Sequence, residues 1–100
     1  MRSSETETLV LICLLDGPKH GYALGDDLNE LLGQRPGPGT LYGAIARLEQ
    51  GGLITQRPSD DRRKPYALTG AGVERATKSV AKVEAVAREG RRRLRARQAT

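Results

Sequence analysis

The sequence predicts a mainly α-helical domain with one small β-hairpin, followed by a long C-terminal helix. Three observations support this fold class. Apolar residues recur at helical spacing in several segments. Two short β segments flank a polar loop, and Gly or Pro residues separate most of the elements. At 100 residues, the chain has the length of one small domain.

The first helix is expected to begin at Ser4. Ser4 and Glu7 have the S-x-x-E spacing of a capping box, in which each side chain bonds to the other residue's backbone N–H. The apolar run Leu9–Leu15 then indicates a short helix that is buried on most sides. Gly17 and Pro18 end this helix, because Gly accepts the left-handed conformation and Pro cannot continue the hydrogen bonding.

The second helix is predicted over residues 20–32. Its apolar residues lie at i, i+4, i+7 and i+8, and this single stripe consists of Leu24, Leu28, Leu31 and Leu32. Gly33 ends the helix. The segment 33–39 (GQRPGPG) is a turn, because five of its seven residues are Gly or Pro. His20 stands at the helix start, where a capping or turn role is favoured over metal binding or acid–base catalysis.

The third helix is predicted from Pro38 or Gly39 to Gln50. Its buried stripe consists of Leu41, Ala44, Ile45 and Leu48. The opposite face begins with small residues. It carries Gly39, Gly43, Ala46 and Gln50, and it is flanked by Thr40, Tyr42 and Arg47. Small side chains let a helix approach another surface closely, so this face is the candidate binding surface.

Two β segments, 53–57 and 65–68, indicate a hairpin around the polar loop 58–64. Three helices followed by such a hairpin predict a winged helix-turn-helix, in which the helix before the wing enters the DNA major groove. The wing loop carries the basic cluster Arg62, Arg63 and Lys64. A wing places such side chains beside the phosphates that flank the groove.

A long last helix is predicted from Gly70 to about Ala96, with Thr69 as its N-cap. Its small apolar residues alternate at spacings of three and four, which is the rhythm of a coiled-coil seam. These residues are Val73, Ala76, Val80, Val83, Ala87, Gly90 and Leu94. A helix of about 40 Å is longer than a domain this small can cover, so we expect the seam to join two copies of the chain.

The chain is therefore divided into a DNA-binding domain, residues 1–69, and a dimerisation helix with a basic tail, residues 70–100. The tail is expected to fray, and its arginines are Arg91, Arg92, Arg93, Arg95 and Arg97. A second subunit would also supply burial that the chain lacks, because only 37% of its residues are hydrophobic and it has no Phe or Trp.

Charge is distributed unevenly along the chain. Residues 1–50 carry four basic and seven acidic side chains, a net charge of −3. Residues 51–100 carry thirteen basic and five acidic side chains, a net charge of +8. This distribution suits a polyanionic partner, and it equally suits a solvated basic surface, so charge alone does not decide between them.

Composition excludes several other functions. Cys13 is the only cysteine and His20 the only histidine, so there is neither an internal disulfide nor a cluster of soft metal ligands. No nucleophile–base pair is identifiable, so we expect neither an enzyme nor a bound cofactor. No apolar run approaches the roughly 18 residues of a membrane span, and a cytoplasmic protein is expected.

Three motifs resemble the signature of the PadR family of transcriptional repressors. They are GPKHGYAL at 17–24, GTLYGAIARLEQGGLI at 39–54 and YALTGAG at 66–72. The resemblance covers residues 9–75, and it covers the last helix only in kind. It implies a homodimer that represses transcription from pseudo-palindromic operators in double-stranded DNA. It also implies dimerisation through the C-terminal helix, with help from the first helix.

The resemblance further implies which residues face DNA. Those at matching positions are Tyr22, Thr40, Tyr42 and Arg47, and the wing residues Arg62, Arg63 and Lys64 are added by analogy. On periodicity alone, Tyr22 and Tyr42 are slightly better interpreted as tyrosines at the edge of the core. The sequence lacks the tryptophan against which some drug-sensing members stack their ligands, which argues against an aromatic-ligand pocket of that kind. The resemblance allows for a small-molecule effector that relieves repression, but the sequence does not identify one.

The alternative function is a winged-helix module in which the third helix binds a protein and not DNA. The basic wing and the small residues on the exposed face of that helix argue against it.

Overall fold

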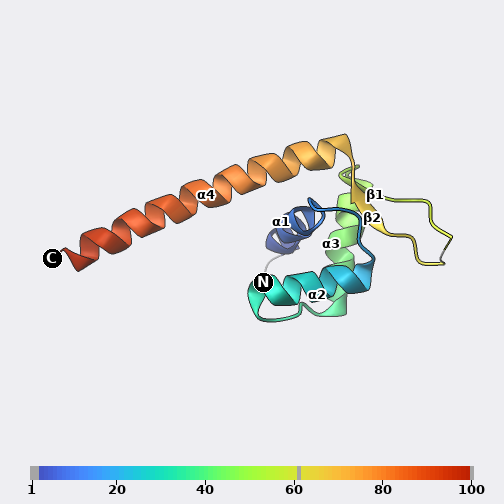
Figure 1. Ribbon diagram of the computed structural model, residues 1–100, viewed down its shortest axis with the longest axis horizontal. Helices are drawn as coiled ribbons and strands as arrows, with labels where there is room; N and C mark the ends of the chain where they lie inside the picture. The colour runs from blue at the N-terminus through green and yellow to red at the C-terminus, as the bar shows by residue number, and fades with distance from the viewer. Residues whose placement is uncertain (1–2, 61, 100) are drawn as a thin grey trace.

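The structure, a computed structural model, describes residues 3–60 and 62–99. Its elements in chain order are α1 (Ser3–Cys13), α2 (Gly21–Leu32), α3 (Pro38–Gln50), β1 (Ile54–Gln56), β2 (Tyr66–Leu68) and α4 (Gly70–Gln98). Figure 1 shows the three short helices packed together, with the hairpin loop extending on one side and α4 on the other. The predicted fold class, mainly α-helical with a β-hairpin wing, is confirmed.

The core lies around α1, which packs against α2, α3 and the start of α4. Its buried members are Val10, Leu11, Cys13, Leu14, Leu24, Leu28, Leu41, Ile45, Leu48, Ile54 and Ala76. The buried stripe predicted for α3 is confirmed, because its four residues are each at most 3% exposed. Full burial of a Leu or Ile side chain stabilises the fold by about 1.5–3 kcal/mol.

The stripe predicted for α2 is buried only in part. Leu24 and Leu28 are fully buried, whereas Leu31 is 55% and Leu32 38% exposed. Helical spacing places all four on one face, but the last turn of α2 runs past the core and its leucines face solvent. Gly33 ends α2 as predicted, in the left-handed conformation at φ 71°.

The predicted start of α1 is wrong. The helix begins at Ser3, so Ser4 lies inside its first turn and is not the N-cap. Glu7, expected to complete a capping box, instead accepts a hydrogen bond from Arg47 of α3, with Oε2 and Nε 3.1 Å apart. At the start of α2, His20 occupies the N-cap position, but its side chain makes no capping hydrogen bond.

The wing is an antiparallel pair in which Ile54 faces Leu68 and Gln56 faces Tyr66. One backbone contact that the sequence did not predict joins the wing to the loop before α2. Lys19, in the loop before α2, exchanges two backbone hydrogen bonds with Tyr66, at 3.0 and 2.8 Å between N and O atoms. The base of the wing is therefore attached to the start of the helix-turn-helix.

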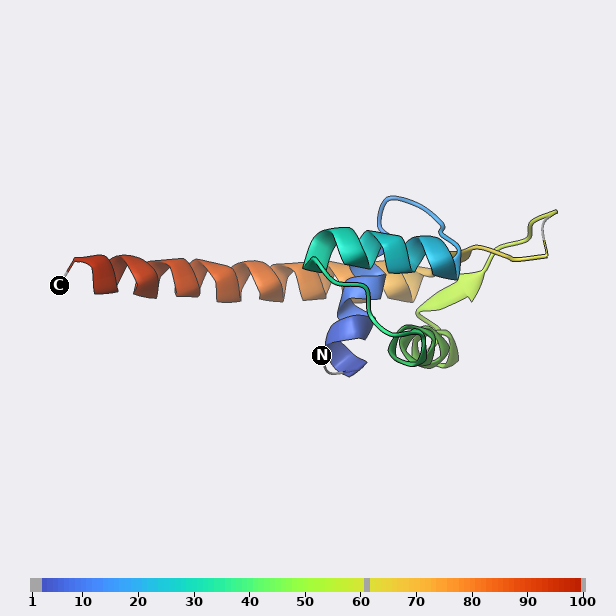
Figure 2. The ribbon, with the colours of Figure 1, turned by 90° about the horizontal axis from the view of Figure 1, so that it is seen from below.

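Helix α4 begins as predicted, with the Thr69 hydroxyl accepting a hydrogen bond from the backbone N of Gly72 at 3.1 Å. It continues to Gln98, so the predicted fraying of the arginine-rich tail is wrong. Only its first part contacts the domain. From Ala81 to Gln98 its residues are exposed, apart from a half-buried Glu89, and Figure 2 shows this part standing clear of the other elements.

The molecule measures 60 × 27 × 20 Å, and α4 accounts for most of its long dimension. Within residues 3–60 and 62–99, no helix combines the length and the apolar character that a membrane span requires.

Candidate nucleic-acid interface

A groove opens between the start of α2, the exposed face of α3 and the wing. Its lining consists of His20, Gly21, Tyr22, Tyr42, Gln56, Arg62, Arg63, Lys64 and Tyr66. The chain has three tyrosines and no Phe or Trp, so every aromatic side chain it possesses is on this groove. Tyr22, Tyr42 and the three basic wing residues, predicted as DNA contacts from separate parts of the sequence, are thus brought together.

The ring of Tyr42 lies against the start of α2. A Cβ added to Gly21 would lie only 2.8 Å from Cε1 and Oη of Tyr42, so the ring would have to shift if this position carried a side chain. Tyr42 nevertheless remains 49% exposed, and Tyr22 is 64% exposed. The Tyr42 ring is therefore supported by α2 on one side, and both rings are open to the groove, an arrangement that suits a phenol that must reach an external acceptor.

Arg62, Arg63 and Lys64 give the other wall of the groove its charge. All three side chains are exposed. Among residues 3–60 and 62–99, no acidic side chain forms an ion pair with them. Three exposed positive charges with no ion-pair partner among the described residues make this part of the surface attractive to phosphate groups.

The exposed face of α3 continues away from the groove. Gly39 and Thr40 are exposed. Thr40 also borders a second hollow, beside the turn between α2 and α3, together with Leu32, Gln34, Pro36 and Gly37. Gly43 is half-buried beneath the Arg47 side chain, whose Nη1 would lie 3.3 Å from an added Cβ. This face is therefore open to a partner at both ends, since Ala46 and Gln50 are also exposed.

Arg47 is held by α1 and does not line the groove. Its ion pair with Glu7 joins partly exposed side chains and contributes at most about 1 kcal/mol. An Arg47 that contacts DNA would have to exchange this carboxylate for the new partner. The sequence does not predict the pair, because the two residues are 40 positions apart and share no periodic pattern.

Lys19 is a second residue that the sequence analysis did not single out. Its Nζ donates hydrogen bonds to Asp16 (2.6 Å), Asp27 (2.7 Å) and the carbonyl oxygen of Cys13. Burial acts to lower the Lys19 pKa, but the hydrogen bonds to Asp16 and Asp27 outweigh it and raise the pKa. A permanently charged Lys19 thus ties α1, α2 and, through its backbone, Tyr66 of the wing into one frame around the groove.

Cys13 sits beneath this frame in the core. Burial and the nearby negative charge of Asp27 raise the pKa of its thiol to about 12, so the thiol stays protonated at neutral pH. The role of a small apolar filler predicted for Cys13 agrees with these surroundings. The described residues contain no group of three or more His, Cys, Asp or Glu side chains that could hold a metal ion.

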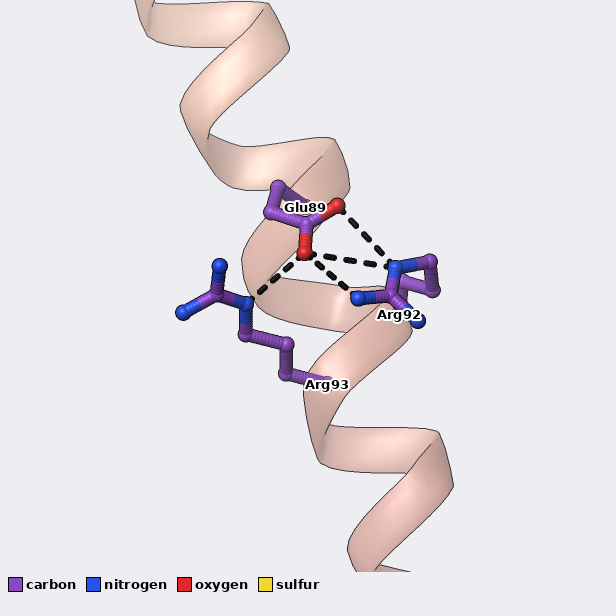
Figure 3. Close-up of polar contacts among 3 residues, drawn as sticks. All are labelled: Glu89, Arg92 and Arg93. Carbon is purple, nitrogen blue, oxygen red and sulfur yellow. Dashed lines mark hydrogen bonds and ion pairs between the residues drawn. The ribbon is translucent and has the colours of Figure 1, made fainter.

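A second concentration of positive charge lies at the end of α4. Figure 3 shows the Glu89 carboxylate accepting hydrogen bonds from both Arg92 and Arg93, with the closest N–O distance 2.7 Å for each. These hydrogen bonds, from Arg92 first and then Arg93, lower the Glu89 pKa below its usual value. Glu89 is the only acid among residues 88–97, which include six arginines, so this end of α4 stays strongly basic.

The residues predicted to form the dimer seam are placed unequally. Ala76 is fully buried in the core of the chain, and Val80 is half-buried. Val73, Val83, Ala87 and Leu94 are exposed. The part of the seam that is open to a second copy is therefore mainly the projecting half of α4, together with Val73 at its start.

Comparison with known proteins places this geometry in a family. A family model described as "Transcriptional regulator PadR-like family" matches residues 10–78. A 37.1 kDa protein of transposon TN4556 from Streptomyces fradiae is 46% identical over 74 residues; the match covers 74% of this chain and 21% of that protein. The chain thus spans about a fifth of the length of that relative.

Solved structures share the fold. A PadR-like transcription factor from Bacteroides fragilis superimposes with a TM-score of 0.77 at 23% identity, covering 92% of each chain. A PadR-like transcriptional regulator from Bacillus cereus has a TM-score of 0.77 at 24% identity, covering 88% of this chain and 89% of that one. At these identities the likeness concerns the arrangement of helices and wing.

Proposed function

The chain belongs to the PadR-like family of transcriptional regulators, and on this premise we propose that it is a cytoplasmic, sequence-specific DNA-binding repressor that acts as a homodimer. The family is one of regulators and not of enzymes. The observation that carries the proposal is the groove, where three tyrosines and three basic wing residues flank the helix expected to enter DNA. Tyrosine hydroxyls beside exposed cations that have no ion-pair partner among the described residues are the chemistry that holds a sugar–phosphate backbone.

In this proposal, α3 and the groove have different tasks. The first turn of α3 carries Gly39 and Thr40, Gly43 lies in the next turn, and this start of the helix approaches base edges in the major groove. Tyr22, Tyr42 and the wing residues hold the adjacent backbone, which fixes the register of α3 but carries no sequence information directly. Arg47 reads bases only after it leaves Glu7.

The dimer is proposed to form through the seam of α4. A two-fold dimer presents two equal copies of α3, so the operator is expected to be a pseudo-palindrome with half-sites about 10 base pairs, or a multiple of this, apart. Selection of bound duplexes from a random DNA pool tests function and symmetry together. Asymmetric selected sites, with one half-site sufficient for full affinity, would contradict the dimeric mode of binding. Failure to bind any duplex would favour the protein-interaction module.

Arg63→Ala is expected to weaken binding to operator and random DNA by similar factors. Arg63 lies on the wing and has no described ion-pair partner, so its loss removes one phosphate contact whatever the sequence. The slope of log affinity against log salt should fall by about 1. Lys82→Ala, which removes one charge from the projecting part of α4, is the control. An unchanged slope for Arg63→Ala would mean that the wing is not on the DNA.

Arg47→Ala is expected to act differently, by eroding the preference for operator over random DNA. A base contact contributes about 1–3 kcal/mol of discrimination at one position. The Glu7 pair allows a matched test, because Glu7→Gln frees Arg47 without removing it. If Arg47 reads bases, Glu7→Gln should keep the preference that Arg47→Ala loses. Equal losses in both variants would assign the ion pair a purely structural role. The measurement is the affinity of each of the two variants for operator DNA and for random DNA across a salt series.

A further inference from the structure

Arg35 lies in the turn between α2 and α3 and reaches back across α2. Its Nη1 forms an ion pair with the Asp26 carboxylate, and its Nη2 donates a hydrogen bond to the backbone oxygen of Tyr22 at 3.0 Å. Its Cζ lies 4.4 Å from the centroid of the Tyr22 ring, the geometry of a cation–π contact. One guanidinium therefore contacts the first two turns of α2 in three ways.

The space that Arg35 occupies is provided by Gly25. A Cβ added at Gly25 would lie 2.5 Å from Nη2 and 2.7 Å from Cζ of Arg35, so the guanidinium rests on the bare helix backbone. A glycine within a helix is less favourable than alanine, because its backbone loses more conformational freedom. The glycine lies in the middle of α2, and no backbone angle requires it there, since its φ is not in the left-handed region.

The ring that Arg35 contacts belongs to the groove. Tyr22 lines the groove together with Tyr42 and the wing, and most of its side chain is open to solvent. An exposed tyrosine on a helix samples several rotamers, and fixing such a side chain on binding lowers affinity by about two- to tenfold. Contact with Arg35 on one side restricts the ring before any partner arrives. The charge of Arg35 is meanwhile offset by Asp26.

We propose that Arg35 is a positioning residue for Tyr22, and that through Tyr22 it strengthens the hold of the groove on the DNA backbone. This inference rests on the proposed function. It explains why the turn between α2 and α3 carries an arginine that pairs with α2. The effect is independent of base sequence, because the phenol of Tyr22 faces phosphate and sugar.

The test uses the full chain and a random-sequence DNA duplex, so that no operator needs to be known. Arg35→Ala is expected to weaken binding about three- to tenfold with no change in salt slope. In a Tyr22→Ala background, the same substitution should have no further effect. Lys82→Ala controls for the loss of one positive charge, and Arg35→Lys, which cannot make all three contacts, should restore only part of the affinity.

Gly25→Ala supplies a second, charge-neutral variant. It keeps Arg35, Tyr22 and Asp26 but fills the place of the guanidinium, and alanine favours the helix. It should reproduce the loss seen for Arg35→Ala while the thermal unfolding temperature is kept. In the free protein, NMR signals of the Tyr22 ring should shift in both variants, and those of the Tyr66 ring should not.

Other outcomes overturn the inference. An equal loss for Arg35→Ala with and without Tyr22, accompanied by a lower salt slope, would show that Arg35 contacts phosphate itself. Unchanged affinity in both Arg35→Ala and Gly25→Ala would show that the contact has no role in binding. If the wild-type chain binds no duplex, the proposed function fails, and the Tyr22 NMR signals still decide whether Arg35 orients the ring.

Discussion

Val83→Asp is expected to convert the proposed homodimer into a monomer, whereas Ala85→Asp should leave it intact. Val83 is 54% exposed in the protomer and belongs to the seam of α4, so in the dimer it would be buried against the second copy. An aspartate there places an unpaired charge in the interface, at a cost of about 3–5 kcal/mol for each protomer. Because the dimer contains two such charges, dimer affinity should fall more than about 10,000-fold.

The choice of position follows from how the seam is placed. Ala76 is fully buried in its own protomer, and Val80 is half-buried, so charges there would unfold the domain and disturb association together. Val83 and Ala85 both lie on the projecting part of α4. Two steps along an α-helix rotate the side chain by about 200°, so the two residues lie on nearly opposite sides of α4 and only Val83 faces the seam. Sedimentation equilibrium gives the oligomeric state, and circular dichroism shows whether α4 remains helical. A dimeric Val83→Asp protein would mean that the subunits associate elsewhere.

The secondary structure could be predicted closely because its signals are local. The four-residue stripe of α3 follows from helical spacing alone, and Thr69 caps α4 with a hydroxyl at the expected position. The hairpin follows from two β segments around a polar loop. The start of α1 was misplaced because S-x-x-E is a weak pattern when further helix-compatible residues precede it. Leu31 and Leu32 show that periodicity identifies a face but not how far the core extends along it.

The candidate site was predictable in its residue types but not in its contacts. Wing charge and helix periodicity predicted Arg63 and Thr40, and the motif resemblance contributed Tyr22. The contacts that arrange these residues join Arg35 to Tyr22, Lys19 to Tyr66 and Glu7 to Arg47. Each depends on how helices and wing pack in three dimensions, for which a single sequence carries no periodic signal. Tyr66 could have been predicted as a residue of the groove, because it lies on the return strand of the wing.

The largest effect on stability is expected from Gly72→Ala, at the end of the YALTGAG motif. A Cβ at this position would lie 2.0 Å from the carbonyl oxygen of Leu53 and 3.1 Å from a methyl group of Leu68. The Leu53 carbonyl cannot move freely, because it accepts a hydrogen bond from the backbone N of Thr69 at 3.0 Å. The Thr69 hydroxyl in turn donates to the carbonyl oxygen of Gly52 at 2.7 Å. The start of α4 therefore packs directly on the chain that enters β1.

Relief of this overlap has to separate α4 from the wing or break the hydrogen bond between Thr69 and Leu53. Overpacking costs about 1–3 kcal/mol, and the lost hydrogen bond adds about 1 kcal/mol. In a domain of this size, such a loss lowers the midpoint of thermal unfolding by roughly 10–20 °C. Gly70→Ala is the matched control, because it lies in the same helical turn and has no atom within 4 Å of an added Cβ. Calorimetry of the two variants separates steric overlap from helix propensity, since both gain the same methyl group. Equal midpoints would show that the Leu53 carbonyl yields without cost, and that the close approach of α4 to β1 is not what requires a glycine in this motif.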